Sequence, residues 1–237
     1  MYAVGHLALG YIIGRTCSRA TGTNANMPLI FALSILPDID LLLAPRMHRG
    51  PTHSLIILAV MATPFLIVWR LKSIPYVAAY AQHLLIGDMI AGTTQYLWPV
   101  SIEEYGFGVV MGSPIEVGLE WAFFLASLIL MIELGDFMNM LRPSRSNLLF
   151  IVPCIGAGSL FVQMKLIILP FMMHQISYYR YSPELVVPQI FYFAYFLLAI
   201  IMYLWKTTAS RIRKSVLTIT GAFRRTKDWS RPSDLPV

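Results

Sequence analysis

The sequence has little charge and almost no cysteine. Only 13% of its 237 residues are Asp, Glu, Lys or Arg, while 57% are hydrophobic. A soluble domain carries roughly 25% charged residues, so this composition excludes an ordinary water-soluble protein. The two cysteines, Cys17 and Cys154, lie far apart and fall in or beside apolar segments. They exclude a disulfide framework and a cysteine-rich zinc site, so a metal site would have to use histidine and carboxylate ligands.

Several motifs that identify classes of enzyme or transporter are also missing. The sequence contains no His-Glu-x-x-His motif, no glycine-rich phosphate loop and no Gly-x-Ser-x-Gly nucleophile elbow. A zincin-type intramembrane protease is therefore unsupported. The sequence also has no convincing internal repeat, which argues against a transporter built from two inverted halves.

Long apolar runs predict an all-α polytopic membrane protein, a helical bundle with about seven apolar segments. A hydrocarbon core about 30 Å thick needs roughly 20 helical residues to cross it. The predicted segments are 4–14, 27–43, 54–69, 75–91, 115–134, 147–173 and 186–205. We expect the first two to form a hairpin that spans only partly, because they are short or interrupted by Pro37, Asp38 and Asp40.

These segments leave no stretch long enough for a separate soluble domain. We expect one membrane-embedded domain over residues 1–205, with its site motifs within 1–100, and a basic tail over 206–237. From Lys206 to Arg231 the tail has eight basic residues against one acidic residue. A basic tail directly after an apolar span predicts a cytoplasmic anchor against anionic lipid headgroups.

The distribution of basic residues predicts the orientation in the cell membrane. Cytoplasmic loops carry an excess of Lys and Arg. With the tail inside, the other cytoplasmic basic residues would be Arg15, Arg19, Arg70, Lys72, Arg142 and Arg145. The loop with Arg46 and Arg49 is the exception, because the same reasoning places it outside.

Histidines and carboxylates gather in the first ninety residues, at the predicted extracytoplasmic side. Ionisable groups at membrane depth are costly and mark functional sites by default. Carboxylate and imidazole together suit zinc, manganese or iron. The candidate metal ligands are His6, Asp38, Asp40, His48, His53, His83 and Asp88.

Three groups of residues in or beside this set leave alternatives open. Pro37 disfavours continued helix, so the carboxylates of Asp38 and Asp40 could both face one cation, although one Asp could instead cap a helix. Thr52 and Ser54 are candidate N-caps for the apolar segment that follows. Arg49 could neutralise an Asp of the turn or clamp a phosphoryl group with its planar guanidinium.

His83 and Asp88 lie on one apolar helix, five residues apart. On a regular helix their side chains would point about 140° apart. A π-bulge at Gly87 would bring them together, and such bulges are frequent at functional sites. Without a bulge, Asp88 would lie outside the ligand set or serve a different metal, and His83 could simply bond to a neighbouring helix.

Glu116 and Glu120 are four residues apart and share a helix face. If that face meets the site, Glu120 could be a ligand or a proton-transfer group. The alternative is an interfacial pair that faces water. Arg49, Asp88 and Glu120 are therefore the candidate catalytic residues.

At this point the sequence resembles a known family, the membrane-bound metal-dependent hydrolases. This inner-membrane group includes a bacterial member under DNA-damage (LexA) control. The resemblance covers roughly residues 1–100, and its motifs are Gly5-His6, Pro37-Asp38-Ile39-Asp40, His48-Arg49-Gly50-Pro51-Thr52-His53-Ser54 and the stretch from His83 to Trp98-Pro99. One spacing differs, because many members place the aspartate four residues after the histidine, whereas Asp88 comes five after His83.

The family is remotely similar to the zinc-dependent phospholipase C and P1-type nuclease superfamily. The resemblance implies hydrolysis of a phosphoester at two or three divalent metal ions, zinc first, with manganese or iron as alternatives. Asp38 or Asp40 would bridge the ions, and Arg49 would stabilise charge on the phosphoryl oxygens.

The substrate would be a lipid or another membrane-associated molecule. Arg46 and Arg49 favour an anionic phospholipid headgroup, and no nucleic-acid partner is predicted. One alternative is a non-enzymatic metal-binding or transport protein that uses the same ligands. The other is a structural membrane protein whose polar groups only brace its helices.

Overall fold

A computed structural model describes residues 1–40, 49–163 and 182–228. In these residues the regular structure is helical, apart from one isolated antiparallel bridge between Thr94 and Tyr105. The predicted all-α class is therefore confirmed. The α-helices are α1 (Ala3–Ala20), α2 (Met27–Ile35), α4 (Leu55–Trp69), α5 (Ile74–Gln82), α6 (Pro114–Glu133), α7 (Asp136–Leu141), α8 (Ile151–Gln163) and α9 (Val186–Asp228). The short elements are η1 (Leu36–Ile39), η3 (Pro51–His53), η4 (Arg70–Lys72), the π-helical η5 (His83–Asp88), η6 (Arg145–Phe150) and η8 (Pro183–Leu185).

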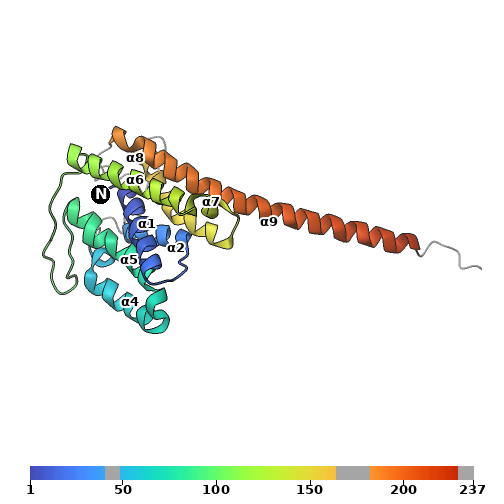
Figure 1. Cartoon of the computed structure of the whole chain (residues 1–237), viewed down its shortest axis with the longest axis horizontal. Helices are drawn as coiled ribbons and strands as arrows, with labels where there is room; N and C mark the ends of the chain where they lie inside the picture. The colour runs from blue at the N-terminus through green and yellow to red at the C-terminus, as the bar shows by residue number, and fades with distance from the viewer. Residues whose placement is uncertain (41–48, 164–181, 229–237) are drawn as a thin grey trace, which may run out of the picture.

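Helix α1 lies at the centre of the bundle and contacts α2, α5 and α6 (Figure 1). It is buried over most of its N-terminal three turns, where Val4, Leu7 and Tyr11 have no exposed surface. Helices α1 and α2 approach closely, because a Cβ at Gly10 would collide with the side chain of Ser34. This close approach brings the His6 end of α1 and the end of α2 against α5.

Three helices among the described residues are long and apolar enough to cross a membrane: Leu55–Lys72, Pro114–Glu133 and Pro183–Arg213. The prediction of about seven apolar segments is thus confirmed only in part. Predicted segment 4–14 lies within α1, a helix of the core. In predicted segment 27–43 the α-helix ends at Ile35, just before Pro37. Segment 75–91 is divided between α5 and η5. The last part of segment 147–173 lies outside the described residues.

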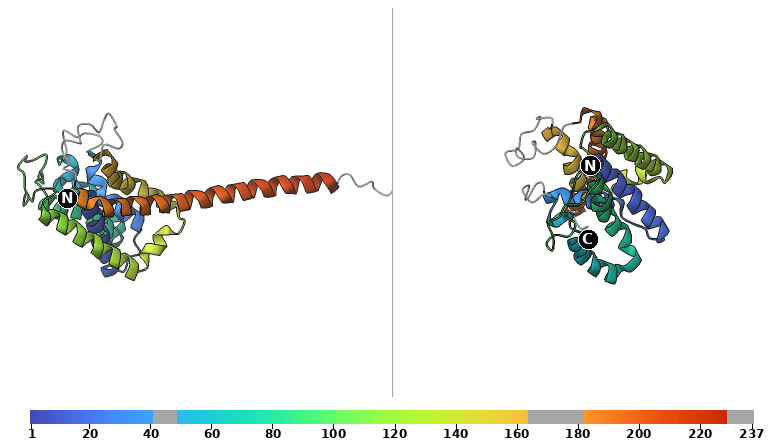
Figure 2. Two further views of the ribbon diagram at one scale, coloured as in Figure 1. Left: turned by 90° about the horizontal axis from the view of Figure 1, so that it is seen from above. Right: turned by 90° about the vertical axis from the view of Figure 1, so that its left-hand side faces the viewer.

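Helix α9 is longer than the predicted span 186–205. It runs for 43 residues, which corresponds to about 65 Å of helix. The first residues of the predicted basic tail therefore continue the same helix as far as Asp228. In Figures 1 and 2 this C-terminal half of α9 extends away from the other helices.

Candidate metal centre

Imidazole and carboxylate side chains from four elements converge at one buried cluster. His6 comes from α1, Asp38 from η1 and His53 from η3, while His83 and Asp88 come from η5. Among the described residues, two groups could each hold a metal ion, with potential ligand atoms within 4.8 Å of one another. One group is His6, His83 and Asp88, and the other is Asp38, His53 and His83. The two groups share His83.

The π-helix explains how His83 and Asp88 reach the same cluster. A π-helix forms i→i+5 hydrogen bonds, so residues five apart lie near one another along one face. The segment His83–Asp88 is π-helical, and the Nε2 atom of His83 lies 3.8 Å from the Oδ2 atom of Asp88. Of the two alternatives that the sequence left open, the structure has the π-helical one, and the five-residue spacing is compatible with a shared site.

Gly87 lets α1 approach this π-helix. The ring of His6 stacks on the ring of His83, with centroids 3.7 Å apart and planes inclined by 14°. A Cβ at Gly87 would collide with the imidazole of His6. Glycine is therefore required here for close approach, a role that the sequence pattern alone did not indicate.

His83 is oriented by the backbone of α2. Its Nδ1 atom lies 2.8 Å from the carbonyl oxygen of Ser34. A carbonyl only accepts hydrogen bonds, so Nδ1 donates its proton to Ser34 and Nε2 is the nitrogen that remains for the cluster. That Nε2 atom lies 3.3 Å from Oδ1 of Asp38. His83 thus bonds to a neighbouring helix through one nitrogen and faces the cluster with the other.

The two aspartates of the Pro37–Asp40 turn lie on opposite sides of His53. Oδ1 of Asp38 is 3.5 Å from Nε2 of His53, whereas Oδ2 of Asp40 is 3.3 Å from Nδ1 of the same ring. The prediction placed both carboxylates toward one cation. The turn is instead a 3₁₀-helix, whose three residues per turn direct side chains two apart in different directions. Asp38 faces the other ligands, whereas Asp40 contacts Nδ1 of His53, on the side of the ring away from Asp38.

The residues around His53 fix Asp40 in that position. Its Oδ2 atom accepts hydrogen bonds from the Thr52 hydroxyl at 2.8 Å and from the Arg49 backbone N–H at 3.2 Å. Thr52 is therefore a partner of Asp40 and not a helix cap. The cap of α4 is Ser54, whose Oγ accepts from the N–H groups of Ile56 and Ile57 as predicted.

Negative charge is in excess around His53. Burial opposes a charge on this ring, but the carboxylates of Asp88, Asp38 and Asp40 outweigh that effect and raise the pKa of His53 to about 10. The carboxylates around the ring therefore favour positive charge at this site. The same excess of carboxylate favours a metal cation.

The donor atoms fit a divalent cation. Nδ1 of His6, Nε2 of His83 and Oδ2 of Asp88 are buried and have no hydrogen-bond partner among the described residues. Buried polar atoms of this kind are costly unless another group satisfies them. Imidazole nitrogen and carboxylate oxygen together suit zinc, manganese or iron.

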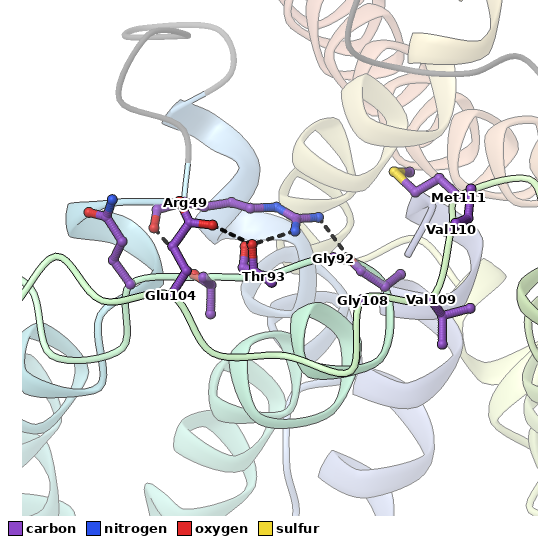
Figure 3. A pocket seen from close by; sticks show the side chains of 11 residues that line it. Arg49, Gly92, Thr93, Glu104, Gly108, Val109, Val110 and Met111 are labelled. Carbon is purple, nitrogen blue, oxygen red and sulfur yellow. Dashed lines mark hydrogen bonds between the residues drawn. The ribbon is translucent and has the colours of Figure 1, made fainter.

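Arg49 lies between the ligand cluster and a pocket of about 410 Å³. Its guanidinium donates to the carbonyl oxygens of Thr93 and Ala91, both at 2.9 Å, and lies 3.9 Å from Oδ1 of Asp88. Figure 3 shows the side chain stretched along the pocket beside Gly92 and Thr93. The sequence also allowed Arg49 to neutralise an aspartate of the turn. In the described contacts, its backbone N–H donates to Asp40, while its guanidinium lies nearest the carboxylate of Asp88.

Glu120 lies away from the ligand cluster, at the start of α1. Its two oxygens accept from the N–H groups of Tyr2 at 2.6 Å and Gly5 at 2.5 Å. Helix α1 has no side-chain cap of its own, so a carboxylate from α6 takes that position. The water-facing alternative is wrong for Glu120, which is fully buried. Glu120 is in neither of the two groups that could hold a metal ion, and its proton-transfer role stays a prediction.

Glu116 is buried beside it, and its Oε2 atom accepts from the N–H of Gly112 at 3.0 Å. The interfacial alternative is therefore wrong for this residue too. His48, the remaining predicted ligand, lies outside the residues that the structure describes.

Comparison with known proteins gives one family match. A family model described as YdjM inner membrane protein matches residues 1–167, which include every candidate metal ligand. No curated protein matches the chain. No solved structure matches it either.

Proposed function

The chain belongs to the YdjM inner membrane protein family, and from that premise we propose that it is a membrane-embedded metal-dependent hydrolase. The reaction is cleavage of a phosphoester in a lipid or another membrane-associated substrate. The observation that carries this proposal is the meeting of three imidazoles and two carboxylates in one buried cluster: His6, Asp38, His53, His83 and Asp88.

In this proposal the chain supplies metal ligands, their orientation and a phosphoryl-binding group. A bound divalent cation would polarise a phosphoryl oxygen and make a bound water more acidic. Asp40 contacts Nδ1 of His53, and the Ser34 carbonyl contacts Nδ1 of His83. These contacts orient the two rings, as the outer partners of metal-binding histidines commonly do. Arg49 uses its fork of N–H donors at the pocket to bind a phosphoryl oxygen.

Zinc is the proposed metal, with manganese and iron as alternatives of the same ligand chemistry. The two ligand groups share His83, whose one available nitrogen binds one ion. A second ion would therefore need ligands other than His83, such as the carboxylates of Asp38 or Asp88. A content of two or more zinc ions per chain would mean that the carboxylates hold a second ion beside the one at His83. A content of one ion would mean that both ligand groups serve the same ion.

The proposed site faces the extracytoplasmic side of the cell membrane, and the C-terminal part of α9 lies in the cytoplasm. The excess of basic residues after Trp205 supports this orientation. A membrane-impermeant maleimide would test it in right-side-out vesicles. In variants lacking Cys17 and Cys154, Glu103→Cys should be labelled at once and Ser210→Cys only after permeabilisation; the reverse order contradicts the orientation.

Burial of the imidazoles also suits a second function, non-enzymatic metal binding or transport. His53 and His83 have no exposed surface, which favours long retention of an ion. Such a protein would bind metal through the same ligands and hydrolyse nothing.

The test begins with the metal content of the purified full-length chain. We expect stoichiometric zinc that is lost in the double variant Asp38→Ala, His53→Ala and kept in Glu103→Gln, which changes an exposed carboxylate outside the cluster. Metal kept by the double variant would refute the site. The loaded protein is then incubated with lipid and nucleotide phosphoesters. Release of phosphate or headgroup supports hydrolysis, and uniform inactivity of the zinc-loaded protein contradicts it in favour of the second function.

A further inference from the structure

Two side chains of opposite charge line the pocket beside the metal cluster. One is Arg49, and the other is Glu104, from the loop that precedes α6. Among the described residues, no other charged side chain lines this pocket. Its volume of about 410 Å³ is within the roughly 300–1,000 Å³ typical of small-molecule sites. The pocket therefore offers a positive and a negative group to one ligand.

Thr93 holds both charged groups in place. Its carbonyl oxygen accepts from Nη1 of Arg49 at 2.9 Å, and its hydroxyl donates to Oε2 of Glu104 at 2.5 Å. Figure 3 shows the carboxylate and the guanidinium on either side of Thr93. In the described part of the chain they form no ion pair with each other, and the guanidinium lies 3.9 Å from Asp88. Glu104 is exposed, so its carboxylate is accessible to a ligand.

The backbone around the pocket is shaped to hold Arg49. Gly92 has a φ of 102°, and a Cβ at this position would collide with Nη1 of Arg49. A Cβ at Gly106 would collide with the carbonyl oxygen of Gly92, so the two sides of the loop also pack closely. Arg49 itself has a φ of 65°. This conformation is uncommon for a residue other than glycine, and such residues cluster at functional sites.

The apolar residues of the pocket lie on the other side of the guanidinium from Glu104. Figure 3 shows Val109, Val110 and Met111 at that end. The chain then continues to α6, one of the candidate membrane spans. The pocket therefore presents a carboxylate, a guanidinium and an apolar end in that order.

We propose that this pocket binds a phosphoester whose alcohol carries an ammonium group, as in phosphoethanolamine, with the phosphate at Arg49 and the ammonium at Glu104. The inference rests on the proposed hydrolase function and names the substrate class of that site. A guanidinium has five N–H donors, and two of those on Arg49 bind backbone carbonyls, so others can bind phosphoryl oxygens. An ammonium and a carboxylate form a charge-assisted hydrogen bond. A phosphate that carries only glycerol would leave Glu104 without such a partner.

Calorimetric titration tests the pocket independently of catalysis. The full-length chain in detergent, with zinc present, is titrated with phosphoethanolamine and with glycerol 3-phosphate, which has the same phosphate but no amine. We expect the wild type to bind phosphoethanolamine more tightly. Glu104→Gln keeps an oxygen that can accept from Thr93 but removes the charge, so it should weaken phosphoethanolamine binding about fivefold and leave glycerol 3-phosphate binding unchanged. Glu104→Lys should reverse the preference, because it places a second positive charge in the pocket.

Glu103→Gln is the matched control. Glu103 is the neighbouring exposed carboxylate, but it accepts from the Tyr105 hydroxyl at 2.8 Å and does not line the pocket. Its replacement should change neither affinity. Equal affinity of the wild type for the two compounds, or binding of neither, would overturn the proposal. An equal loss of both affinities in Glu104→Gln would also overturn it, because the carboxylate would then only support the loop.

A hydrolysis assay separates this inference from the proposed function and identifies the source of the ligand. The substrates are phosphatidylethanolamine in nanodiscs and soluble glycerophosphoethanolamine. Cleavage of the first would identify a membrane lipid, and cleavage of the second alone a soluble ester; both support the proposal. If neither is cleaved, the hydrolase function fails, and the two affinities still decide whether the pocket binds an ammonium phosphoester. Cleavage of phosphatidylglycerol alone, with equal affinities, would support the hydrolase function and overturn this inference.

Discussion

The Nε2 atom of His83 lies 3.8 Å from the Oδ2 atom of Asp88, although a regular α-helix would point the two side chains in different directions. The intervening turn is π-helical, and this geometry places both residues beside His53 and Asp38. The five-residue spacing, which left the role of Asp88 open, is accommodated by a local change of helix type. The predictions below follow from that arrangement.

Replacing Gly87 should disturb the metal centre through His6. In Gly87→Ala the new methyl group would occupy the position of the His6 imidazole. Overpacking of this kind costs about 1–3 kcal/mol, and we expect a lower melting temperature together with reduced metal content. Thermal unfolding and metal analysis of the purified variant measure both effects.

Gly118→Ala is the control for that substitution, because a Cβ at Gly118 meets no atom within 4 Å. It should keep wild-type metal content and gain slightly in stability, since alanine favours helix. Normal zinc binding in Gly87→Ala would show that the stacked position of His6 is not needed.

Asp38 and Asp40 should differ in their effect on metal binding. Asp38 faces the ligand cluster, whereas Asp40 holds His53 from the other edge of the ring. We expect Asp38→Asn to abolish stoichiometric binding and Asp40→Asn to weaken affinity by about 10–100-fold. Zinc titration of the metal-free variants measures this, and equal losses would contradict the distinction.

Glu120→Ala should destabilise the bundle without emptying the metal site. The substitution leaves the buried N–H groups of Tyr2 and Gly5 without their acceptor. The expected cost is about 1–3 kcal/mol of unfolding free energy, measured by thermal or denaturant unfolding in detergent. Lost zinc with unchanged stability would instead favour the ligand role, one of the two roles at the site that the sequence left open for Glu120.

Arg49→Lys should separate substrate binding from metal binding. The planar guanidinium of Arg49 donates to the Ala91 and Thr93 carbonyls through two nitrogens. Lysine has a single ammonium nitrogen, so it cannot keep both bonds and also bind a phosphoryl oxygen in the same geometry. We expect wild-type zinc content and a fall in phosphoester cleavage of roughly 10²-fold. Unchanged cleavage would remove Arg49 from the phosphoryl-binding role.

The sequence predicted the helical class and all five residues that meet in the cluster. Both predictions rest on local signals: long apolar runs, and polar groups that are costly at membrane depth. The possibility of a π-helix was also visible, since His83, Gly87 and Asp88 lie on one apolar segment. The close packing of His6 against Gly87 was not, because it depends on how α1 and η5 meet.

Other errors have the same origin in tertiary structure. The spacing of Asp38 and Asp40 does not reveal the 3₁₀ turn that sends their side chains to different edges of His53. The capping of α1 by Glu120 joins residues 118 and 115 positions apart, and no local pattern records it. Apolar segment 4–14 looked like a partial span because burial inside a helical bundle and burial in lipid select the same residues.

X-ray absorption at the zinc edge of the zinc-loaded, full-length chain tests the central claim most directly. The account predicts nitrogen and oxygen ligands at about 2.0–2.2 Å, with the multiple-scattering pattern of imidazole, which should weaken in His83→Ala. A spectrum without imidazole, or one with sulfur ligands that is unchanged in His83→Ala, would contradict the claim that the His6, Asp38, His53, His83 and Asp88 cluster binds the metal.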